Sequence, residues 1–257
     1  MSSTLGTLFL VPNTLGDDGR AEQLPWVLPS ETIAKTSQLT HWIVEDAKTA
    51  RAFLKAVDAV SPLACTIQEM QMSEWRGLAR NAKYADGVKP IDLLKPLMAG
   101  KDMGLMSEAG VPGVADPGAE LVLAAHKLGA KVKPLVGPSS ILLGLMASGL
   151  NGQRFAFQGY IPHDAQDRVA KLKQLEVESR KLQQTQIWIE TPYRNTAMLM
   201  ACLNTLSPHS MLCLGMDLSL KSESITTLSI AEWRKRYPNE AACASLQNRP
   251  AIFLLLA

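Results

Sequence analysis

The stretch GLMSEAGVPGVADPGAELVLAAHKLGAKVKPLVGPSS, residues 104–140, decides the fold of this chain. It predicts a short apolar strand at Leu105 and Met106, a loop rich in glycine and proline, and a helix whose apolar residues recur at i, i+3, i+4 and i+7. A second strand at residues 132–136 runs into the turn GPSS, which opens another helix. In an open α/β sheet, ligands bind at the edge where such strand ends lie.

The rest of the chain also alternates short apolar segments with amphipathic ones. Before residue 104 we expect strands at 8–11, 41–44 and 63–67, helices at 30–39, 46–57 and 91–98, and an irregular segment at 24–29. This alternation implies parallel strands joined by right-handed crossovers. After residue 140 we expect a fully buried helix at 141–148, a long charged helix at 164–184, and strands at 155–158, 187–189, 211–216, 222–228 and 251–256.

These elements predict two α/β domains, residues 1–113 and 114–257. The first has a parallel sheet. The later strands are joined more directly, which indicates a mixed sheet in the second domain. A domain boundary inside the glycine-rich loop places a ligand cleft between the two domains, which is a common location for a binding site.

The composition is that of a globular protein with an ample core, because 47% of the 257 residues are hydrophobic and 19% are charged. The net charge of +2 neither requires nor excludes an anionic partner. The four cysteines are scattered, which disfavours a metal site or a disulfide framework and favours a reducing compartment. With no apolar run of about 20 residues and no secretory signal pattern, we expect a cytoplasmic protein without a membrane span.

Several catalytic signatures are missing from the chain. The sequence contains no GxxxxGK[ST], HExxH or GxSxG motif, and no GxGxxG follows its first strand. Glycine and hydroxyl loops with few charges suit a ligand held by backbone groups, such as a nucleoside or amino-acid moiety. A turn-forming role would explain one such loop, whereas two loops at the same sheet edge favour a binding site.

At this point the residues resemble a known family. SEAGVPGVADPG (107–118) followed by VGPSS (136–140) resembles the tetrapyrrole methylase superfamily, the class III S-adenosyl-L-methionine-dependent methyltransferases. The likeness continues through GTLFLVP from Gly6, VEDAKTARAFL from Val44, ASGLNGQRFAFQGYIP from Ala147 and ETPYR from Glu190. Within the superfamily, the sequence most resembles the branch that methylates a ribose 2′-hydroxyl of small-subunit ribosomal RNA.

The resemblance implies a homodimer of two-domain subunits, with the methyl donor S-adenosyl-L-methionine folded in the cleft. Carried over to matching positions, it implies donor contacts from both halves of the chain. These positions are Pro12, Ala109, Gly110, Val111, Val114, Ser139, Ser140, Glu190, Leu218 and Pro250.

A ribose hydroxyl is a weak nucleophile and benefits from a proton acceptor. Glu108 and Asp46 are the catalytic candidates, with Asp116 a third, because each follows an expected strand end. Capping the following helix is an equally good explanation of Asp46. Asp116 precedes Pro117 in a sequence typical of a turn.

The sequence departs from the ribosomal branch on the acceptor side. The first loop is VPNTLGD where the branch has a glycine-richer TPIGNLGD, and the HEHNE-like stretch is replaced by QEMQM, which keeps only Glu69. A KGE-like turn has become Asn248-Arg249-Pro250, and we expect no counterpart of that branch's extra C-terminal segment after Ala257.

Cations near the expected site are candidates for acceptor binding. Lys48 and Arg51, beside the VED motif, are the better candidates for binding RNA. Glu69, the residue kept from the HEHNE-like stretch, is the third candidate for contact with the acceptor. Arg76, Arg80 and Lys83 follow in the next segment. On the long charged helix, interleaved acids favour a solvated surface instead. The same cations would serve a tetrapyrrole, which carries several carboxylates. The acceptor is therefore a small-subunit ribosomal RNA, or alternatively a tetrapyrrole or another small molecule; a catalytically silent donor-binding protein is the third interpretation.

Overall fold

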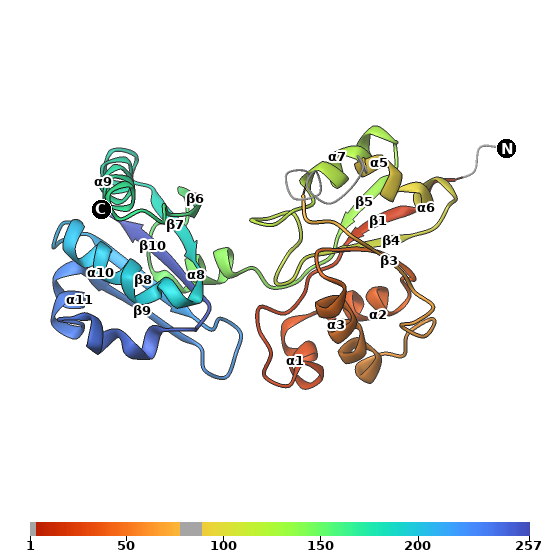
Figure 1. The fold of residues 1–257 in the computed structure, drawn as a ribbon, viewed down its shortest axis with the longest axis horizontal. Helices are drawn as coiled ribbons and strands as arrows, with labels where there is room; N and C mark the ends of the chain where they lie inside the picture. The colour runs from red at the N-terminus through yellow and green to blue at the C-terminus, as the bar shows by residue number, and fades with distance from the viewer. Residues whose placement is uncertain (1–3, 78–88) are drawn as a thin grey trace. The chain divides into compact units, whose positions relative to one another are not determined.

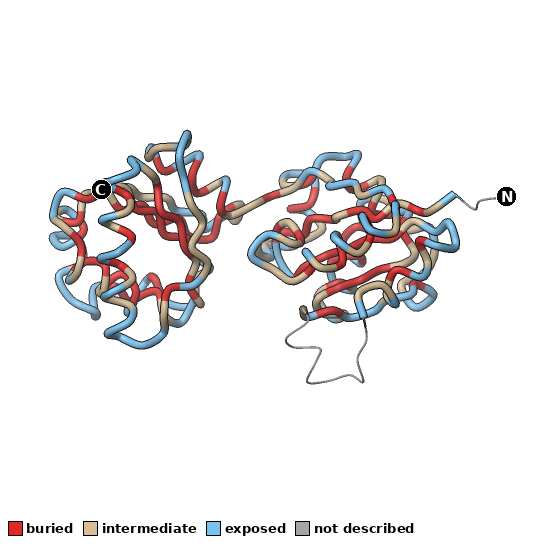
Figure 2. Tube along the Cα trace, turned by 90° about the horizontal axis from the view of Figure 1, so that it is seen from above, coloured by how far each residue is buried: buried red, intermediate tan, exposed pale blue. Residues whose placement is uncertain are grey.

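The computed structural model describes residues 4–77 and 89–257, and it divides into two compact units, Met1–Ser139 and Ser140–Ala257. Both are sheets covered by helices (Figure 1), and the buried residues lie in the interior of each unit (Figure 2), where the central strands are. The division falls later in the chain than the predicted boundary after residue 113. The reason is that the strand at Lys131–Pro134 pairs with Thr7–Leu10 and so completes the first sheet.

The first unit contains a five-stranded parallel sheet, as predicted. Its order is β3-β2-β4-β1-β5, and every neighbouring pair is parallel. The strands are β1 (Thr7–Leu10), β2 (His41–Val44), β3 (Gln71–Glu74), β4 (Met103–Met106) and β5 (Lys131–Pro134). All five carboxyl ends therefore lie along one edge.

Helices cover both faces of this sheet (Figure 1). On one face lie α1 (Arg20–Val27), α2 (Ser30–Ser37) and α3 (Ala47–Val60). On the other lie α5 (Pro90–Leu93), α6 (Lys95–Met98) and α7 (Ala119–Lys127). Each face buries its own apolar cluster, so α3 inserts Phe53 and Leu54 on one side while α7 inserts Leu121 on the other. Burial on both faces is what a parallel sheet requires.

Two local predictions in this unit are wrong. Residues 63–67 form bends and turns instead of a strand, and β3 follows at Gln71–Glu74. Leu63 and Ile67 still pack against the apolar cluster, which explains why the segment looks like a strand in sequence. The segment at 24–29, expected to be irregular, contains the end of α1, which continues through Pro25 to Val27 and buries Leu24 fully.

The second unit contains the predicted mixed sheet, in the order β6-β7-β10-β8-β9. Only β6 and β7 are parallel; the other pairs are antiparallel. The strands are β6 (Phe155–Tyr160), β7 (Thr185–Glu190), β8 (Met211–Met216), β9 (Ser224–Ser229) and β10 (Ala251–Leu256). The helices are α8 (Ser140–Ser148), α9 (Ala165–Leu182), α10 (Asn195–Thr205) and α11 (Ile230–Arg236), with short 3-10 turns η1 (Pro192–Arg194) and η2 (Glu240–Leu246).

The helix α8 is buried on one side only, although its sequence predicts burial all round. Ile141 and Leu145 are buried, and Gly144 allows a close approach to β10, because a Cβ there would lie 2.9 Å from Ile252 Cγ2. Leu142 and Met146, by contrast, are 53% and 79% exposed. A nine-residue helix lying on a sheet can bury one stripe, whatever the composition of its other face.

The close packing of β2 on β4 leads to a stability prediction. Gly104 is paired with Trp42 in register, and a Cβ at residue 104 would lie 2.4 Å from two carbons of the Trp42 ring. We expect Gly104→Ala to lower the free energy of unfolding by about 2 kcal/mol, because the overpacked ring must move. Gly152→Ala is the control, since nothing lies within 4 Å of its added Cβ. Equal chemical denaturation midpoints for the two variants would contradict the expectation.

Candidate functional site

Asn13 joins the loop after β1 to the loop after β4. Its side-chain nitrogen donates to the Glu108 carbonyl at 2.8 Å, and its backbone N–H donates to the Gly110 carbonyl at 2.8 Å. The Asn13 side chain is fully buried, and its Oδ1 accepts from the backbone of Thr14. Asn13 is not among the site residues predicted from the sequence. Its position after the first predicted strand, in a loop that contains glycines, is the sequence feature that could have identified it.

The loop after β4 owes its shape to its glycines. Gly110, Gly113 and Gly118 all have positive φ, at +66°, +77° and +137°. A Cβ on Gly110 would lie 3.1 Å from Leu15 Cδ2 and 3.4 Å from the Pro138 carbonyl oxygen. The loops after β1, β4 and β5 therefore meet at this glycine, as the sequence predicts.

The predicted donor contacts of the first unit gather at this edge. Ala109 and Val114 are exposed, whereas Gly110 is buried beneath them. Pro12 packs closely on the loop after β5, because a Cβ on Gly137 would lie 2.3 Å from two of its ring carbons. Ser139 ends that loop. The remaining contact in this unit, Val111, is half-buried beside Gly110.

Three carboxylates lie together at the same edge: Glu45, Glu108 and Asp116. The Glu45 Oε2 atom accepts from the Glu108 backbone N–H at 3.4 Å. Burial raises the pKa of Asp116 to about 6, and the charges of Glu45 and Glu108 add to this effect, while a hydrogen bond with Ser107 opposes it. A carboxyl with a pKa near 6 is better suited to accept a proton near neutral pH than an ordinary aspartate.

Asp46 is the N-cap of α3. Its Oδ1 accepts from the Thr49 backbone N–H at 2.8 Å, and its Oδ2 lies 3.2 Å from Arg76 Nη2. The hydrogen bond from Thr49 lowers the pKa of Asp46, and Arg76 contributes. These contacts give Asp46 the capping role that was the alternative to catalysis, and they make its carboxylate a weak base.

The acceptor candidates lie in different places. Lys48 and Arg51 are exposed on α3, near the carboxyl end of β2. Glu69, in contrast, precedes β3 and accepts from the Thr66 backbone N–H and hydroxyl, at 2.9 and 2.8 Å. It therefore lies at the amino end of a parallel strand, at the edge opposite the glycine loop. Arg80 and Lys83 lie outside the described residues.

In the second unit, Glu190 ends β7 and is 5% exposed. Its Oε1 accepts from the Thr191 backbone N–H at 2.8 Å, and its Oε2 is 3.3 Å from Arg194 Nη2. Ser140 begins α8. The glutamate is thus held in a fixed orientation by the turn that follows it.

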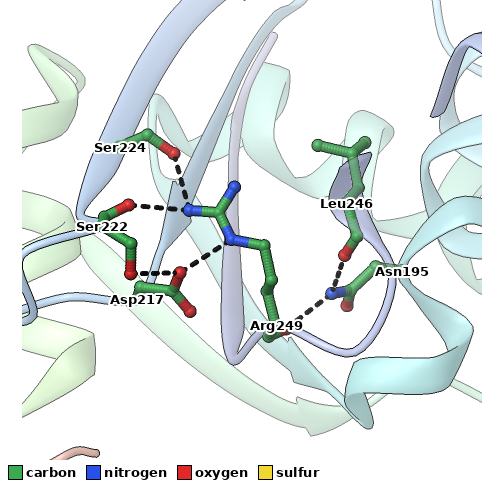
Figure 3. A network of polar contacts seen from close by, with 6 residues as sticks. All are labelled: Asn195, Asp217, Ser222, Ser224, Leu246 and Arg249. Carbon is green, nitrogen blue, oxygen red and sulfur yellow. Dashed lines mark hydrogen bonds and ion pairs between the residues drawn. The ribbon is translucent and has the colours of Figure 1, made fainter. Parts of the chain in front are cut away.

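The carboxyl ends of β7 and β8 meet the start of β10, because Ala251 is in register with both Glu190 and Met216. Leu218 and Pro250 are joined here through the Asp217 backbone N–H, which donates to the Pro250 carbonyl at 3.0 Å. Arg249 and Asp217 form the polar centre of this edge (Figure 3). From the sequence, Asn248-Arg249-Pro250 is only a departure from the family pattern, and Arg249 is not among the predicted site residues.

Comparison with known proteins finds relatives that are named as methyltransferases. The chain is 35% identical over 140 residues to Ribosomal RNA small subunit methyltransferase I of Vibrio cholerae, covering 54% of this chain and 47% of that protein. It is 28% identical over 232 residues to the Bacillus subtilis protein of that name, covering 90% and 70%. The first match thus spans about half the length of the relative. No family model matches the chain.

Solved structures settle the fold. The methyltransferase CobJ superposes with a TM-score of 0.58 at 13% identity, covering 98% of this chain and 94% of that one. The uroporphyrin-III C-methyltransferase of Thermus thermophilus, complexed with S-adenyl homocysteine, gives 0.54 at 16% identity, covering 98% and 97%. The chain has the tetrapyrrole methylase fold. The fold expected from the sequence, a parallel α/β domain followed by one with a mixed sheet, is thereby confirmed.

Within residues 4–77 and 89–257, no helix has the length and apolarity needed to cross a bilayer. The same residues include no group of three or more His, Cys, Asp or Glu placed to hold a metal ion.

The raised pKa of Asp116 predicts a pH dependence of stability. The unfolded carboxyl titrates near 3.8 and the folded one near 6, so the stabilising contribution of the proton is full below pH 4 and is lost as the pH rises through 6. Asp116→Asn, which mimics the protonated carboxyl, should match the wild-type Tm at pH 4 and exceed it by a few degrees at pH 7.5.

Thermal unfolding from pH 4 to 8 measures this difference. Asp167→Asn, at an exposed acid in α9, is the matched control. If the Tm difference from the wild type is the same for both variants at every pH, the pKa of Asp116 is not raised.

Proposed function

We propose that this chain is an S-adenosyl-L-methionine-dependent methyltransferase that methylates a ribose hydroxyl of ribosomal RNA. The observation that carries the proposal is the meeting of the loops after β1, β4 and β5 at Gly110, held by Asn13. Exposed backbone beside a buried glycine suits a nucleoside ligand. A solved structure of the same fold is complexed with S-adenyl homocysteine.

The donor supplies the chemistry, because its sulfonium carries a methyl group that a nucleophile can displace in line. The protein's part is to orient the two reactants and exclude water. We assign donor binding in the first unit to Pro12, the backbone of Ala109, Gly110 and Val111, and also Val114 and Ser139. In the second unit we assign it to Ser140, Glu190, Leu218 and Pro250.

The proton lost by the acceptor hydroxyl needs a nearby base. Glu108 remains our candidate together with Asp116, the third candidate from the sequence, whose raised pKa comes from burial and from Glu45 and Glu108. Two carboxylates that repel each other's charge accept one proton readily between them. Asp46 is the weaker candidate because it caps α3 and pairs with Arg76.

Gly110 provides a test of donor binding. Gly110→Val would bring a branched side chain against Leu15 and Pro138 in the left-handed region, so we expect at least a tenfold loss of affinity for S-adenosylhomocysteine in calorimetry. Gly129→Val is the matched control, because residue 129 also has positive φ, at +76°, but nothing lies within 4 Å of its Cβ. Both variants thus place a branched residue in the left-handed region, at φ of +66° and +76°. Equal affinities of the two variants for S-adenosylhomocysteine would show that the donor does not bind at the glycine loop.

RNA as the acceptor is favoured by the relatives' name and by the exposed face of α3. Lys48, Arg51 and Lys55 are exposed at i, i+3 and i+7, so they share one face and span about 10 Å of helix. Among the described residues, none of the ion pairs involves these three cations. Unpaired cations in a row are suited to consecutive phosphates.

Transfer of labelled methyl groups distinguishes the acceptors. We expect label in small ribosomal subunit RNA; label in a precorrin-like tetrapyrrole alone would reject the RNA proposal in favour of a small-molecule enzyme. Donor binding without transfer to either acceptor would favour a silent binding protein. We also propose a cytoplasmic homodimer, which light scattering of the purified chain tests for subunit number.

The cations of α3 give a separate prediction. Lys48→Ala with Arg51→Ala should weaken binding of ribosomal RNA about tenfold and reduce the salt dependence of log K by roughly 0.7 to 1 per charge removed. Filter binding at several salt concentrations measures both. Lys171→Ala with Lys173→Ala, on the mixed-charge helix α9, removes the same charge and should have a much smaller effect. Identical salt slopes for the two double variants would place RNA elsewhere.

A further inference from the structure

One arginine holds the loop between β8 and β9 in place. Arg249 Nε donates to Asp217 Oδ2 at 2.7 Å, and Nη2 donates to the Ser222 carbonyl at 2.7 Å and the Ser224 hydroxyl at 3.4 Å. Ser222 Oγ donates to the same Asp217 oxygen at 2.8 Å (Figure 3). A single guanidinium therefore fixes both ends of the loop.

The loop needs this support because its backbone is unusual. Asp217 and Ser219 both have positive φ, at +51° and +69°, on either side of Leu218. Residues with a Cβ adopt this region rarely, and they keep it where surrounding contacts determine it. Here the Asp217 side chain is only 8% exposed, so its charge is turned inward onto Arg249.

Arg249 is itself anchored from the other side. Asn195 Nδ2, at the start of α10, donates to the Arg249 carbonyl at 2.7 Å and to the Leu246 carbonyl at 2.9 Å (Figure 3). Asn248 N–H donates to the Pro192 carbonyl at 3.0 Å. The network thus connects the ends of β7 and β8 with the start of β10, three segments distant in sequence.

We propose that Arg249 is the positioning residue that holds Leu218 and Pro250 for the methyl donor. This inference rests on the proposed function. Arg249 precedes Pro250 in the chain, and it forms an ion pair with Asp217, the residue before Leu218. The positions of both proposed donor contacts therefore depend on Arg249. It acts through the Asp217 carboxylate and the backbone and does not itself touch the donor.

The chemistry explains why an arginine stands here. A guanidinium is a planar fork that donates in several fixed directions, so it can serve the carboxylate and the Ser222 carbonyl together. A lysine keeps the charge but presents a single nitrogen. Arg249→Lys should therefore retain the ion pair with Asp217 and lose the hydrogen bond to the Ser222 carbonyl.

Calorimetry with S-adenosylhomocysteine at 25 °C, on the full chain, tests the inference. We expect Arg249→Met to weaken binding at least tenfold and Arg249→Lys to recover part of that loss. Ser222→Ala, which deletes one hydrogen bond to Asp217, should weaken it about threefold and provides a milder variant if Arg249→Met does not fold. Deuterium exchange should rise in the peptide covering residues 217–223 in each variant.

Arg234→Met is the matched control. The Arg234 guanidinium is also partly buried, and it donates to the Leu203 and Leu206 carbonyls at 2.7 and 3.0 Å, at the end of α10. Loss of the Arg234 guanidinium should lower Tm and leave the affinity for S-adenosylhomocysteine unchanged. If Arg249 had a purely structural role, its variants would show the same pattern. Wild-type affinity in folded Arg249→Lys and Ser222→Ala overturns the inference alone. Failure of the wild-type chain to bind S-adenosylhomocysteine overturns the proposed function, and the inference with it.

Discussion

The carboxamide of Asn13 is the contact on which the geometry of the first unit's edge depends. A parallel sheet brings strand ends to one edge, but it does not fix the loops that leave them. Asn13 does this with one buried side chain, because it donates to the Glu108 carbonyl while its backbone donates to Gly110. Buried hydrogen bonds of this kind are expensive to leave unmade, so the two loops keep one arrangement.

The second unit solves the same problem with charge. There β10 runs between β7 and β8 in the opposite direction, so its start meets their ends. The turn before it carries Arg249, whose fork reaches the opposite loop, and Asn195 closes the network from α10. An amide organises one edge and an ion pair the other.

Much of the fold follows from the sequence because periodicity and burial agree. The strands at 41–44, 211–216 and 251–256 begin and end where their apolar runs do. The pattern fails where apolar residues pack without regular structure, as at Leu63 and Ile67, or where only one side of an apolar helix finds a partner, as at Met146. The hydrophobicity of a residue predicts its tendency to be buried, but it does not show whether a packing partner lies beside it in the fold.

The site follows from the sequence less completely. Glycine-rich loops can be recognised in the sequence from their composition, and the structure brings the loops after β1, β4 and β5 together at Gly110. Asn13, Asp217 and Arg249 act through partners distant in sequence, which spacing does not reveal. Glu69 shows the reverse case: with the third strand expected too early, this residue was assigned to the wrong end of it.

The place of β5 at the edge of the first sheet has a consequence for synthesis of the chain. Each unit is contiguous in sequence, and β5 is the last strand that the first unit requires. Once it has left the ribosome, the amino-terminal unit has all five described strands of its sheet, while the second unit is still partly inside the ribosome and partly untranslated. Domains generally fold in this order, as they emerge. Sequential folding would spare the early strands a search among the later, equally apolar ones.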